Sequence, residues 1–437
     1  FFKDIIGDAS DGKDFELFCK WFLLNDPVWS SFVKNVWLWD DWPGRWGADN
    51  GIDLIFEDKE GFTWAVQSKA YGLHRSVKKA DIDTFISESG RAAIDKRLLI
   101  ASCNVNNKVI KTFEEQEKLS LIYSLSDFES SDLSYPDSID ALSSKAEKIS
   151  FEPRDHQKEA INAAVNGLKT NDRGQLIIAC GTGKTFTTLW IKEKLKPNKT
   201  LVLLPSLSLL SQTLHEWAKA RVDDYSVLNI CSDKTVAKGA DDLKASQSSF
   251  PVTSQIEEIR KHLSSDDPTV VFCTYHSSPL VADAVKGGDF KFDLIISDEA
   301  HRCAGSSKSA FTTALNDALI PAKKRLFVTA TPRYFASSVV NAAETRGSPI
   351  CSMDDSEIFG PVLYELPFGK AIDLGLLTDY QVVVVGVDKP MIKEWIDERE
   401  IIQIDNKAAG DARSLASKIA VIKAIEDYKI KRMITFH

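Results

Sequence analysis

Residues 176–185 read Leu-Ile-Ile-Ala-Cys-Gly-Thr-Gly-Lys-Thr, an apolar run followed by a glycine-rich turn. The apolar run predicts a buried strand, and a helix is expected from Lys184. Glycines in the turn let backbone N–H groups approach a triphosphate, and the helix start favours negative charge. Lys184 is placed to reach the β- and γ-phosphates, and the Thr185 hydroxyl is suited to Mg²⁺. The stretch therefore predicts nucleotide binding by Gly181, Thr182, Gly183, Lys184 and Thr185. The usual motif begins with glycine, and Ile178 stands there instead, so the loop is a variant.

A second informative string, Asp298-Glu299-Ala300-His301, follows the apolar run 293–297. We expect Asp298 at the carboxyl edge of a sheet, where ligands bind in such folds. Asp298 would hold Mg²⁺ directly or through water, and Glu299 would orient and polarise the attacking water. His301 would connect this site to neighbouring elements. Alone, the string also suits a solvated helix start; the glycine-rich turn upstream favours the catalytic interpretation.

An alternation of strands and helices from about residue 151 predicts a parallel α/β sheet of the RecA kind. The expected strands are 176–178, 201–204, 270–272, 294–296 and 325–328. A second α/β unit is expected from about residue 376, with a strand at 381–385, a helix at about 411–428 and a strand at 433–436. A complete second lobe needs on the order of a hundred more residues, so we expect this lobe to be truncated.

The chain is predicted to divide into four parts. Residues 1–125 hold seven of the ten tryptophans. Residues 126–150 are rich in Ser and Asp and predict a linker, because they offer little to bury. Residues 151–350 form the expected first lobe and 351–437 the start of the second. Within the first lobe, residues 231–265 predict a loop or a small insertion.

Composition and charge exclude several classes of protein. The 437 residues suggest roughly three domains, and 43% hydrophobic with 27% charged residues is ordinary globular composition. No apolar run reaches membrane-spanning length, and the first residues lack a signal-peptide pattern. Seven scattered cysteines without zinc-ligand spacing predict reduced core residues in a cytoplasmic protein. The net charge of −9 argues against a surface that coats nucleic acid, although it allows a local basic groove.

These motifs together resemble the superfamily 2 helicases and translocases of the DEAH-box type, over about residues 151–437. Further family motifs follow in order: 151–157, with Gln157 as the expected adenine contact; 204–208 and 274–277, which resemble DNA-backbone motifs; and 329–332, which in the family couples hydrolysis to DNA binding. The resemblance implies ATP and Mg²⁺ as cofactors. The family's arginine finger lies late in the second lobe, beyond residue 437, so this chain is expected to bind ATP but to hydrolyse it poorly.

The N-terminal region contains a second candidate site. Residues 51–56 predict a strand, 58–61 a turn and 62–69 the returning strand. Because side chains alternate along a strand, Gln67 and Lys69 share one face, and Asp53 on the adjacent strand could approach them. A carboxylate, an amide and a lysine around one point suit phosphodiester cleavage: Asp53 would hold Mg²⁺, and Lys69 would stabilise developing charge. The alternative is a plain amphipathic hairpin with solvent-facing polar residues.

This pattern resembles the Mrr-like branch of the PD-(D/E)XK nucleases, which has Gln-x-Lys in place of Glu-x-Lys, over about residues 10–125. Glu16 is a weaker candidate for an additional acid, since an exposed helical glutamate is commoner. The tryptophan-rich segment 37–46 could stack on bases but is expected to pack beside the active site. Arg75, Lys78 and Lys79 are expected either to touch phosphates or to form a solvated helix start.

The order of nuclease, motor loop and DEAH box resembles the N-terminal half of single-polypeptide type ISP restriction–modification enzymes. That resemblance implies an ATP-dependent translocase–endonuclease acting on foreign double-stranded DNA in phage defence. It also implies methyltransferase and target-recognition domains in the same longer polypeptide, and no membrane partner. One alternative is a repair or remodelling helicase whose N-terminal domain binds DNA without cutting it. Another is a nucleotide-switched binding module that does not translocate.

Overall fold

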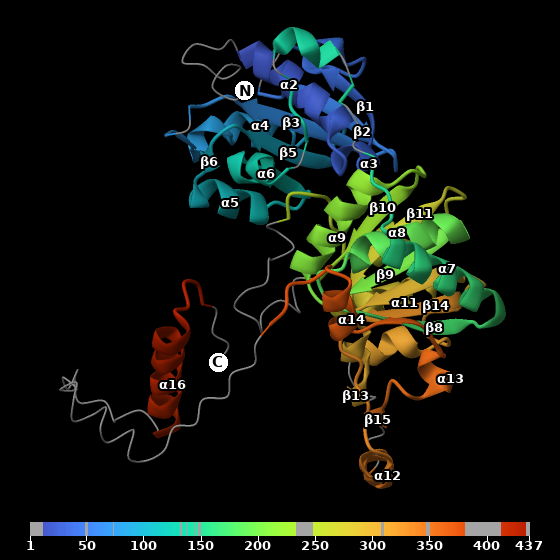
Figure 1. Ribbon diagram of the computed structural model, residues 1–437. Coiled ribbons are helices and arrows are strands. Elements are labelled where there is room, and N and C mark those ends of the chain that lie inside the picture. The colour runs from blue at the N-terminus through green and yellow to red at the C-terminus, as the bar shows by residue number, and fades with distance from the viewer. Residues whose placement is uncertain are drawn as a thin grey trace. The chain divides into compact units, whose positions relative to one another are not determined.

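The computed structural model describes residues 12–48, 51–72, 74–131, 133–136, 138–143, 145–146, 150–232, 248–306, 310–346, 350–380 and 412–433. The chain divides into two compact units, residues 1–376 and 377–437. Figure 1 shows that the first unit contains two sheets, an N-terminal one drawn in blue and a second one drawn from green to orange.

The N-terminal sheet has five strands in the spatial order β1, β2, β3, β5, β7. The pairs β1–β2 and β2–β3 are antiparallel, while β3–β5 and β5–β7 are parallel. The expected hairpin at 51–69 is confirmed as β2 and β3, which pair from Leu54 with Val66 to Glu57 with Thr63. The strands are β1 (Val33–Leu38), β2 (Leu54–Asp58), β3 (Thr63–Lys69), β5 (Lys96–Ala101) and β7 (Ser120–Tyr123), with a small separate pair β4 (Ser76–Val77) and β6 (Asn104–Val105).

Helices cover both faces of this sheet. On one face α2 (Gly12–Asn25) packs its aromatic side chains against Trp64 and Val66. On the other face Ala65 packs in a cluster with α4 (Asp83–Glu88) and α5 (Asn107–Glu114). Because side chains alternate along β3, Gln67 and Lys69 lie on the face of Ala65. The short α3 (Trp29–Phe32) and the 3₁₀ turns η1 (Trp39–Asp41) and η2 (Lys79–Asp81) complete this domain.

The described segments of residues 126–150, the expected linker, include helical structure. They contain α6 (Leu125–Ser130) and the 3₁₀ helix η3 (Ile139–Ser143). Phe128 is 1% exposed, and the partly buried side chains of Leu133, Tyr135, Leu142 and Ala146 pack on the same core as α2. The Ser- and Asp-rich composition conceals this, because a few well-placed apolar side chains are enough to dock a segment on a core.

The second sheet has seven parallel strands in the order β10, β11, β9, β12, β14, β8, β16. All five strands expected from the sequence are present. The strands are β8 (Arg173–Ile178), β9 (Lys199–Leu204), β10 (Ser226–Ile230), β11 (Thr269–Thr274), β12 (Phe292–Asp298), β14 (Ala322–Thr329) and β16 (Val362–Leu366). The sheet thus continues past residue 350, where we expected the first lobe to end. The backbone N–H of Ala179 donates to the carbonyl of Leu366 at 3.0 Å, which ties β16 to the end of β8.

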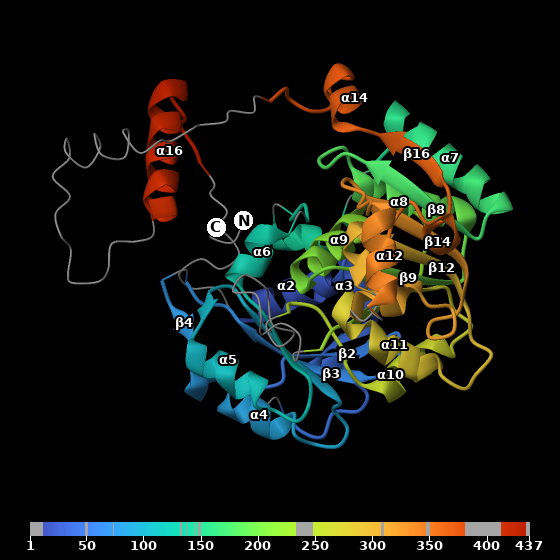
Figure 2. The same cartoon turned by 90° about the horizontal axis from the view of Figure 1, so that it is seen from below.

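Helices lie on both faces of this sheet as well (Figure 2). One face carries α7 (Asp155–Thr170), α8 (Lys184–Leu195) and α9 (Leu207–Ala220); the other carries α10 (Ile256–Leu263) and α11 (Ser278–Val285). The remaining elements are η6 (Tyr275–Ser277), η7 (Ala300–Cys303), η8 (Ala310–Leu315), α12 (Ser337–Thr345), α13 (Ser356–Phe359), α14 (Phe368–Asp373) and the pair β13 (Gly305–Ser306) with β15 (Ile350–Cys351). Of the expected loop at 231–265, residues 233–247 lie outside the described part, and the rest includes α10.

The second unit is described over residues 412–433, together with 377–380. Its helix α16 (Ala412–Tyr428) confirms the helix expected at about 411–428. The strand expected at 381–385, and most of the one expected at 433–436, lie outside the described residues. Across the part of the chain that the structure describes, no helix has the length and apolarity needed to cross a membrane.

A buried guanidinium, paired with a mostly exposed carboxylate, stabilises the second sheet. The guanidinium of Arg325, which is 2% exposed, donates to Asp317 Oδ1 at 2.8 Å and to the carbonyls of Ala314 and Ile320. Partial burial raises the pKa of Asp317, but the charges and hydrogen bonds of Arg325 and Arg173 outweigh it and hold that pKa below 3.8. The contribution of Asp317 to stability is therefore complete at neutral pH and is lost as the pH falls through that lowered pKa.

We predict that Asp317→Asn lowers the free energy of unfolding by about 1–3 kcal/mol at pH 7, because a buried guanidinium loses its charged partner. The matched control is Asp172→Asn, whose carboxylate is 85% exposed beside Lys324 and is expected to change stability by less than about 0.5 kcal/mol. Urea unfolding followed by circular dichroism measures both. Equal effects of the two substitutions would contradict the prediction.

Candidate functional site

The glycine-rich turn lies between the end of β8 and the start of α8. Gly181 and Gly183 have φ of 81° and 86°, which L-residues with a side chain adopt only with strain. A Cβ built on Gly183 would lie 2.5 Å from Gln157 Nε2. The turn thus needs glycine at 183 both for its backbone conformation and for the close approach of Gln157.

The start of α7 holds this turn in place. A ring nitrogen of His156 lies 3.0 Å from the carbonyl of Thr182, and Gln157 Nε2 donates to the carbonyl of Gly183 at 3.2 Å. Gln157 Oε1 in turn accepts from the backbone N–H of Arg154 at 2.8 Å. The sequence singled out Gln157 as a base contact; the structure places it against the loop, where it joins the start of α7 to the phosphate-binding turn.

Lys184 and the segment Asp298–His301 lie side by side at one edge of the sheet. Lys184 Nζ lies 3.0 Å from Glu299 Oε1, and both side chains are mostly buried. They meet because β8 and β12 run parallel on either side of β14, so that their carboxyl ends lie at one edge. Burial lowers the pKa of Lys184, but the charges of Glu299 and Asp298 outweigh it and raise that pKa. Thr185 lies in the first turn of α8, where its carbonyl accepts from Trp217 Nε1 at 3.0 Å.

Asp298 and Glu299 have distinct surroundings. Burial raises the pKa of Asp298 to about 6. The negative charge of Glu299 also raises this pKa, and the positive charge of Lys184 lowers it. Asp298 Oδ1 accepts from the backbone N–H of Glu299 at 2.9 Å. Glu299 has φ of 48°, a left-handed conformation that is uncommon and strained for a residue with a side chain. A cation near Asp298 would relieve the cost of its buried negative charge.

His301 links Glu299 to the segment after β14. Its Nδ1 lies 3.3 Å from Glu299 Oε2 and 2.9 Å from Thr329 Oγ1. Burial lowers the pKa of His301. The negative charge of Glu299 acts to raise this pKa, while the positive charges of Arg333 and Arg302 lower it further. The Nδ1 of His301 thus contacts both the Glu299 carboxylate and the Thr329 hydroxyl.

The nuclease candidates gather at the start of β2 and the end of β3. Asp53 Oδ2 accepts from the backbone N–H of Ser68 at 2.6 Å and from its hydroxyl at 2.9 Å. Asp53 is thus held at the residue between Gln67 and Lys69. Gln67 is 2% exposed, and its Oε1 has no hydrogen-bond partner, although a buried carbonyl oxygen normally has one. Lys69 is half-buried at the end of β3.

The thiol of Cys19 on α2 lies within the influence of two carboxylates. Burial raises the pKa of the Cys19 thiol well above its ordinary value, and the negative charges of Asp53 and Glu16 raise it further. Cys19 therefore lies between the Asp53 strand and Glu16 of its own helix in electrostatic terms, and Glu16 stays a weaker candidate for an additional acid. The sequence ranked Glu16 low, because an exposed glutamate on a helix is the commoner case.

The tryptophan-rich segment packs as expected beside the site. The ring of Trp39, which is 3% exposed, lies 4.9 Å from that of Trp46 and 5.8 Å from that of Trp42. Trp46 Nε1 donates to Glu88, and the guanidinium of Arg91 lies over the Trp46 ring at 4.9 Å. Arg75, by contrast, lies 3.9 Å over the ring of Tyr71. Sequence reasoning missed Ser68, because the family pattern treats the position between Gln67 and Lys69 as any residue.

The residues of both sites suit a divalent cation. Among the described residues, no group of three or more His, Cys, Asp or Glu side chains forms a ready-made metal site. The nuclease site instead offers a carboxylate at Asp53 and the unpartnered Gln67 Oε1, which are hard oxygen ligands. The motor site offers Asp298, whose charge is buried, near the first turn of α8.

Comparisons with known proteins agree with this division into two domains. Residues 24–145 match a family model of the Mrr catalytic type described as "Restriction endonuclease". Residues 150–334 match one described as "Type III restriction enzyme, res subunit". The first match extends across α6 to residue 145, in keeping with the packing of that segment on the nuclease core.

Similar proteins combine the same two parts. The solved structure of the ATP-dependent type ISP restriction–modification enzyme LlaBIII bound to DNA superposes over 99% of this chain and 28% of that chain, at 30% identity and a TM-score of 0.78. A probable helicase of African swine fever virus is 31% identical over 62% of this chain and 29% of its own length. A type I restriction enzyme EcoAI endonuclease subunit of Escherichia coli is 24% identical over 54% of this chain and 24% of its own.

The chain spans less than a third of the length of each of these relatives. The expected fold is confirmed: an Mrr-type nuclease domain precedes a helicase-type ATPase lobe, and the pair resembles type ISP enzymes. The two domains indicate nuclease and ATP-hydrolysing activity, with ATP and a divalent metal as cofactors.

We predict that Gln67→Leu raises the free energy of unfolding by about 1 kcal/mol, because it removes a buried oxygen without a partner. Gln67→Glu should lower stability, because it buries a second carboxylate close to Asp53. Addition of MgCl₂ should then raise the melting temperature of Gln67→Glu more than that of the wild type. Thermal unfolding with MgCl₂ or EDTA measures this; a Leu variant less stable than the wild type would show that Oε1 is satisfied.

Proposed function

We propose that the chain is the nuclease and motor part of an ATP-dependent restriction enzyme that cuts foreign double-stranded DNA. The observation that carries this proposal is the presence, within residues 1–376, of two separate polar sites on two sheets. One is Asp53 with Gln67 and Lys69, and the other is Lys184 with Glu299. The similarity to a DNA-bound type ISP enzyme over 99% of the chain supports the combination.

In the motor site, the backbone of residues 181–183 and Lys184 would bind the phosphates of ATP. Thr185 and Asp298 would hold Mg²⁺, which neutralises phosphate charge. Lys184 would exchange its contact with Glu299 for the phosphates, and this frees the Glu299 carboxylate to orient a water molecule. His301 would then relate the state of Glu299 to the segment at Thr329, through the contacts on its Nδ1.

In the nuclease site, Asp53 and the Oε1 of Gln67 would hold Mg²⁺, with Glu16 as an additional carboxylate. The metal, when bound, supplies activation of water and shielding of the phosphate charge. Ser68 orients the Asp53 carboxylate with two hydrogen bonds. Lys69 would stabilise the charge that develops on the phosphate during cleavage.

The partners follow from the same proposal. A restriction–modification system also needs DNA methylation and target recognition, whereas the two proposed sites serve DNA cleavage and ATP hydrolysis. We therefore propose that methyltransferase and target-recognition domains of a longer polypeptide act with this chain, in the cytoplasm, where foreign DNA arrives. The competing function is a repair or remodelling helicase with a DNA-binding N-terminal domain, and the similarity to a probable viral helicase over 62% of this chain favours it.

Cleavage distinguishes the two functions. We predict that Asp53→Asn abolishes DNA cleavage, by more than about 100-fold, in the polypeptide as its gene encodes it, with ATP, Mg²⁺ and phage DNA. ATP hydrolysis should be unchanged, because the motor site is separate. Asp40→Asn, an exposed carboxylate of the same domain paired with Arg45, serves as the control. If the Asp53→Asn variant cleaves DNA at the normal rate, the nuclease site lies elsewhere. If the wild type does not cleave DNA at all, the result supports the helicase function instead.

The motor residues should divide by role. Lys184→Ala is expected to weaken ATP binding by at least about tenfold, because the phosphates lose a buried cation. Glu299→Gln should keep ATP binding and lower hydrolysis by about 100-fold or more, because the amide cannot take up a proton from water. Fluorescent-nucleotide titration and phosphate release measure the two steps separately. A Glu299→Gln variant with normal turnover would remove this residue from the catalytic role.

A further inference from the structure

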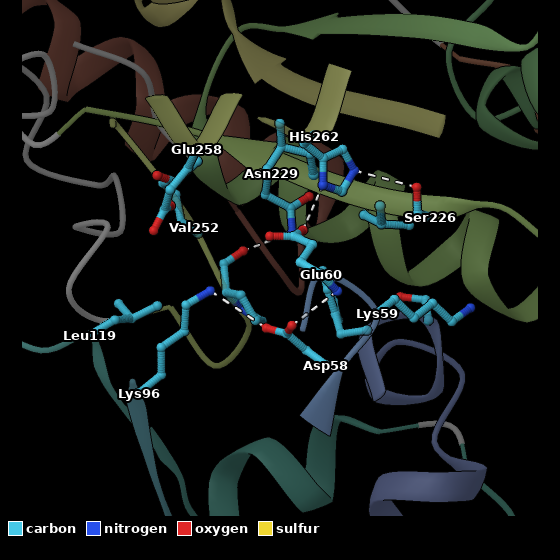
Figure 3. Close-up of a pocket in the computed structure, with 16 residues that line it drawn as sticks. Asp58, Lys59, Glu60, Lys96, Leu119, Ser226, Asn229, Val252, Glu258 and His262 are labelled. Carbon is cyan, nitrogen blue, oxygen red and sulfur yellow. Dashed lines mark hydrogen bonds and ion pairs between the residues drawn. The ribbon is translucent and has the colours of Figure 1, made fainter. Parts of the chain in front are cut away.

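The turn between the two catalytic strands of the nuclease lies against the edge of the motor sheet. This turn, residues 58–62, contacts helix α10, and its residues 58–60 line one pocket together with residues of strand β10 (Figure 3). Glu60 Oε1 lies 2.6 Å from His262 Nδ1, and Lys261 Nζ donates to the carbonyl of Glu60 at 3.2 Å. Lys59 Nζ pairs with Asp224 at 3.3 Å. Three polar contacts therefore join Lys59 and Glu60 of this turn to the motor domain.

The central pair of this contact is removed from solvent. The side chain of His262 is 4% exposed and that of Glu60 is 23% exposed. Burial raises the pKa of Glu60, but the hydrogen bond and charge of His262 and the nearby lysines outweigh it and lower that pKa. On its far side, His262 lies 3.4 Å from Ser226 Oγ of β10. The imidazole thus bridges the nuclease turn and the outermost strand of the motor sheet.

An aromatic ring reinforces the contact. Lys96 Nζ lies 3.9 Å from the centroid of the Phe62 ring, and Lys261 Nζ lies 4.5 Å from it. Lys96 belongs to the nuclease strand β5 and Lys261 to the motor helix α10. One ring of the turn therefore attracts a cation from each domain.

The turn is also rigid within itself. Asp58 Oδ1 accepts from the backbone N–H groups of Glu60 and Phe62, at 3.0 and 2.8 Å. Asp58 Oδ2 accepts from Trp64 Nε1 at 2.9 Å and pairs with Lys96. A displacement at Glu60 would therefore move the turn as one piece and pass directly into β2 and β3.

Those two strands carry the proposed nuclease residues. Asp53 immediately precedes β2, and Gln67 and Lys69 lie in β3. Five steps of nearly extended chain lead from Asp53 to Asp58 at the start of the turn, about 17 Å at the usual rise per residue. The hairpin is thus a single stiff element with the motor contact at one end and the candidate active site at the other.

We propose that the turn 58–62 is the contact through which the motor lobe positions the nuclease hairpin, with Glu60 and His262 as its central positioning residues. A shift of the β10–α10 edge then reaches the Asp53 site through β2 and β3, without passing through residues 126–150. The docking itself is independent of the proposed function; its effect on cleavage rests on that function.

The test reverses one charge. Glu60→Lys places a cation against His262 and Lys261, while Glu257→Lys makes the same change on an exposed face of α10 and is the control. Hydrogen–deuterium exchange of residues 58–62, 226–230 and 256–263 reports docking. Cleavage events per ATP hydrolysed, in the polypeptide as its gene encodes it, report coupling. For Glu60→Lys we expect exchange to rise about tenfold and cleavage per ATP to fall at least tenfold, with ATP binding unchanged.

The double variant Glu60→Lys with His262→Glu restores an opposite-charge pair and should recover both readouts in part. Lys261→Ala, at an exposed position, is a milder second test in case Glu60→Lys does not fold, with a smaller change in both readouts expected. Unchanged exchange in Glu60→Lys and Lys261→Ala would overturn the docking. Raised exchange with normal cleavage per ATP would overturn the positioning. If the wild type cleaves nothing, the proposed function fails, while the exchange result still decides the docking.

Discussion

The ion pair between Lys184 and Glu299 is the contact around which the motor lobe is organised. It joins two motifs 115 positions apart in the sequence, and it can form only if the carboxyl ends of β8 and β12 meet at one sheet edge. The charges of Glu299 and Asp298 raise the pKa of Lys184 against the effect of burial, and the partly buried Asp298 adds negative charge that a cation would balance. The site is therefore polarised in advance for a substrate that carries negative charge with its own metal.

The candidate nuclease site also gathers polar groups suited to a cation, but it contains fewer charged side chains. Asp53 is held by Ser68, and the oxygen of Gln67 is buried without a partner. An amide in place of a carboxylate lowers the repulsion between neighbouring ligands, so the sheet tolerates the site without a bound cation. The cost is a buried polar atom left unsatisfied, of a kind that is commonly found at functional sites.

Much of this organisation could be predicted from the sequence, for physical reasons. The five central strands of the motor sheet are buried on both faces, so each reads as a continuous apolar run. The edge strands β10 and β16 were missed because they are less apolar: β10 contains Asn229, and Val362 of β16 is 45% exposed. Low apolar content also explains why the burial of Phe128, in the Ser- and Asp-rich segment, was not predicted. The role of Glu60 was hidden for another reason, since its partner His262 is remote in the sequence and only folding brings the two together.

Strand β16 has a mechanical implication. It is the last element of the sheet, and the chain continues from it through α14 to the end of the first unit at residue 376. Its final residue, Leu366, is hydrogen-bonded to Ala179, two residues before the first glycine of the phosphate-binding turn. Tension on the chain beyond residue 376 would therefore be transmitted along a backbone already fastened to the nucleotide loop. A pull from one side and a nucleotide from the other would act on the same few peptide groups, so load and ligand affinity would be linked without any moving side chain.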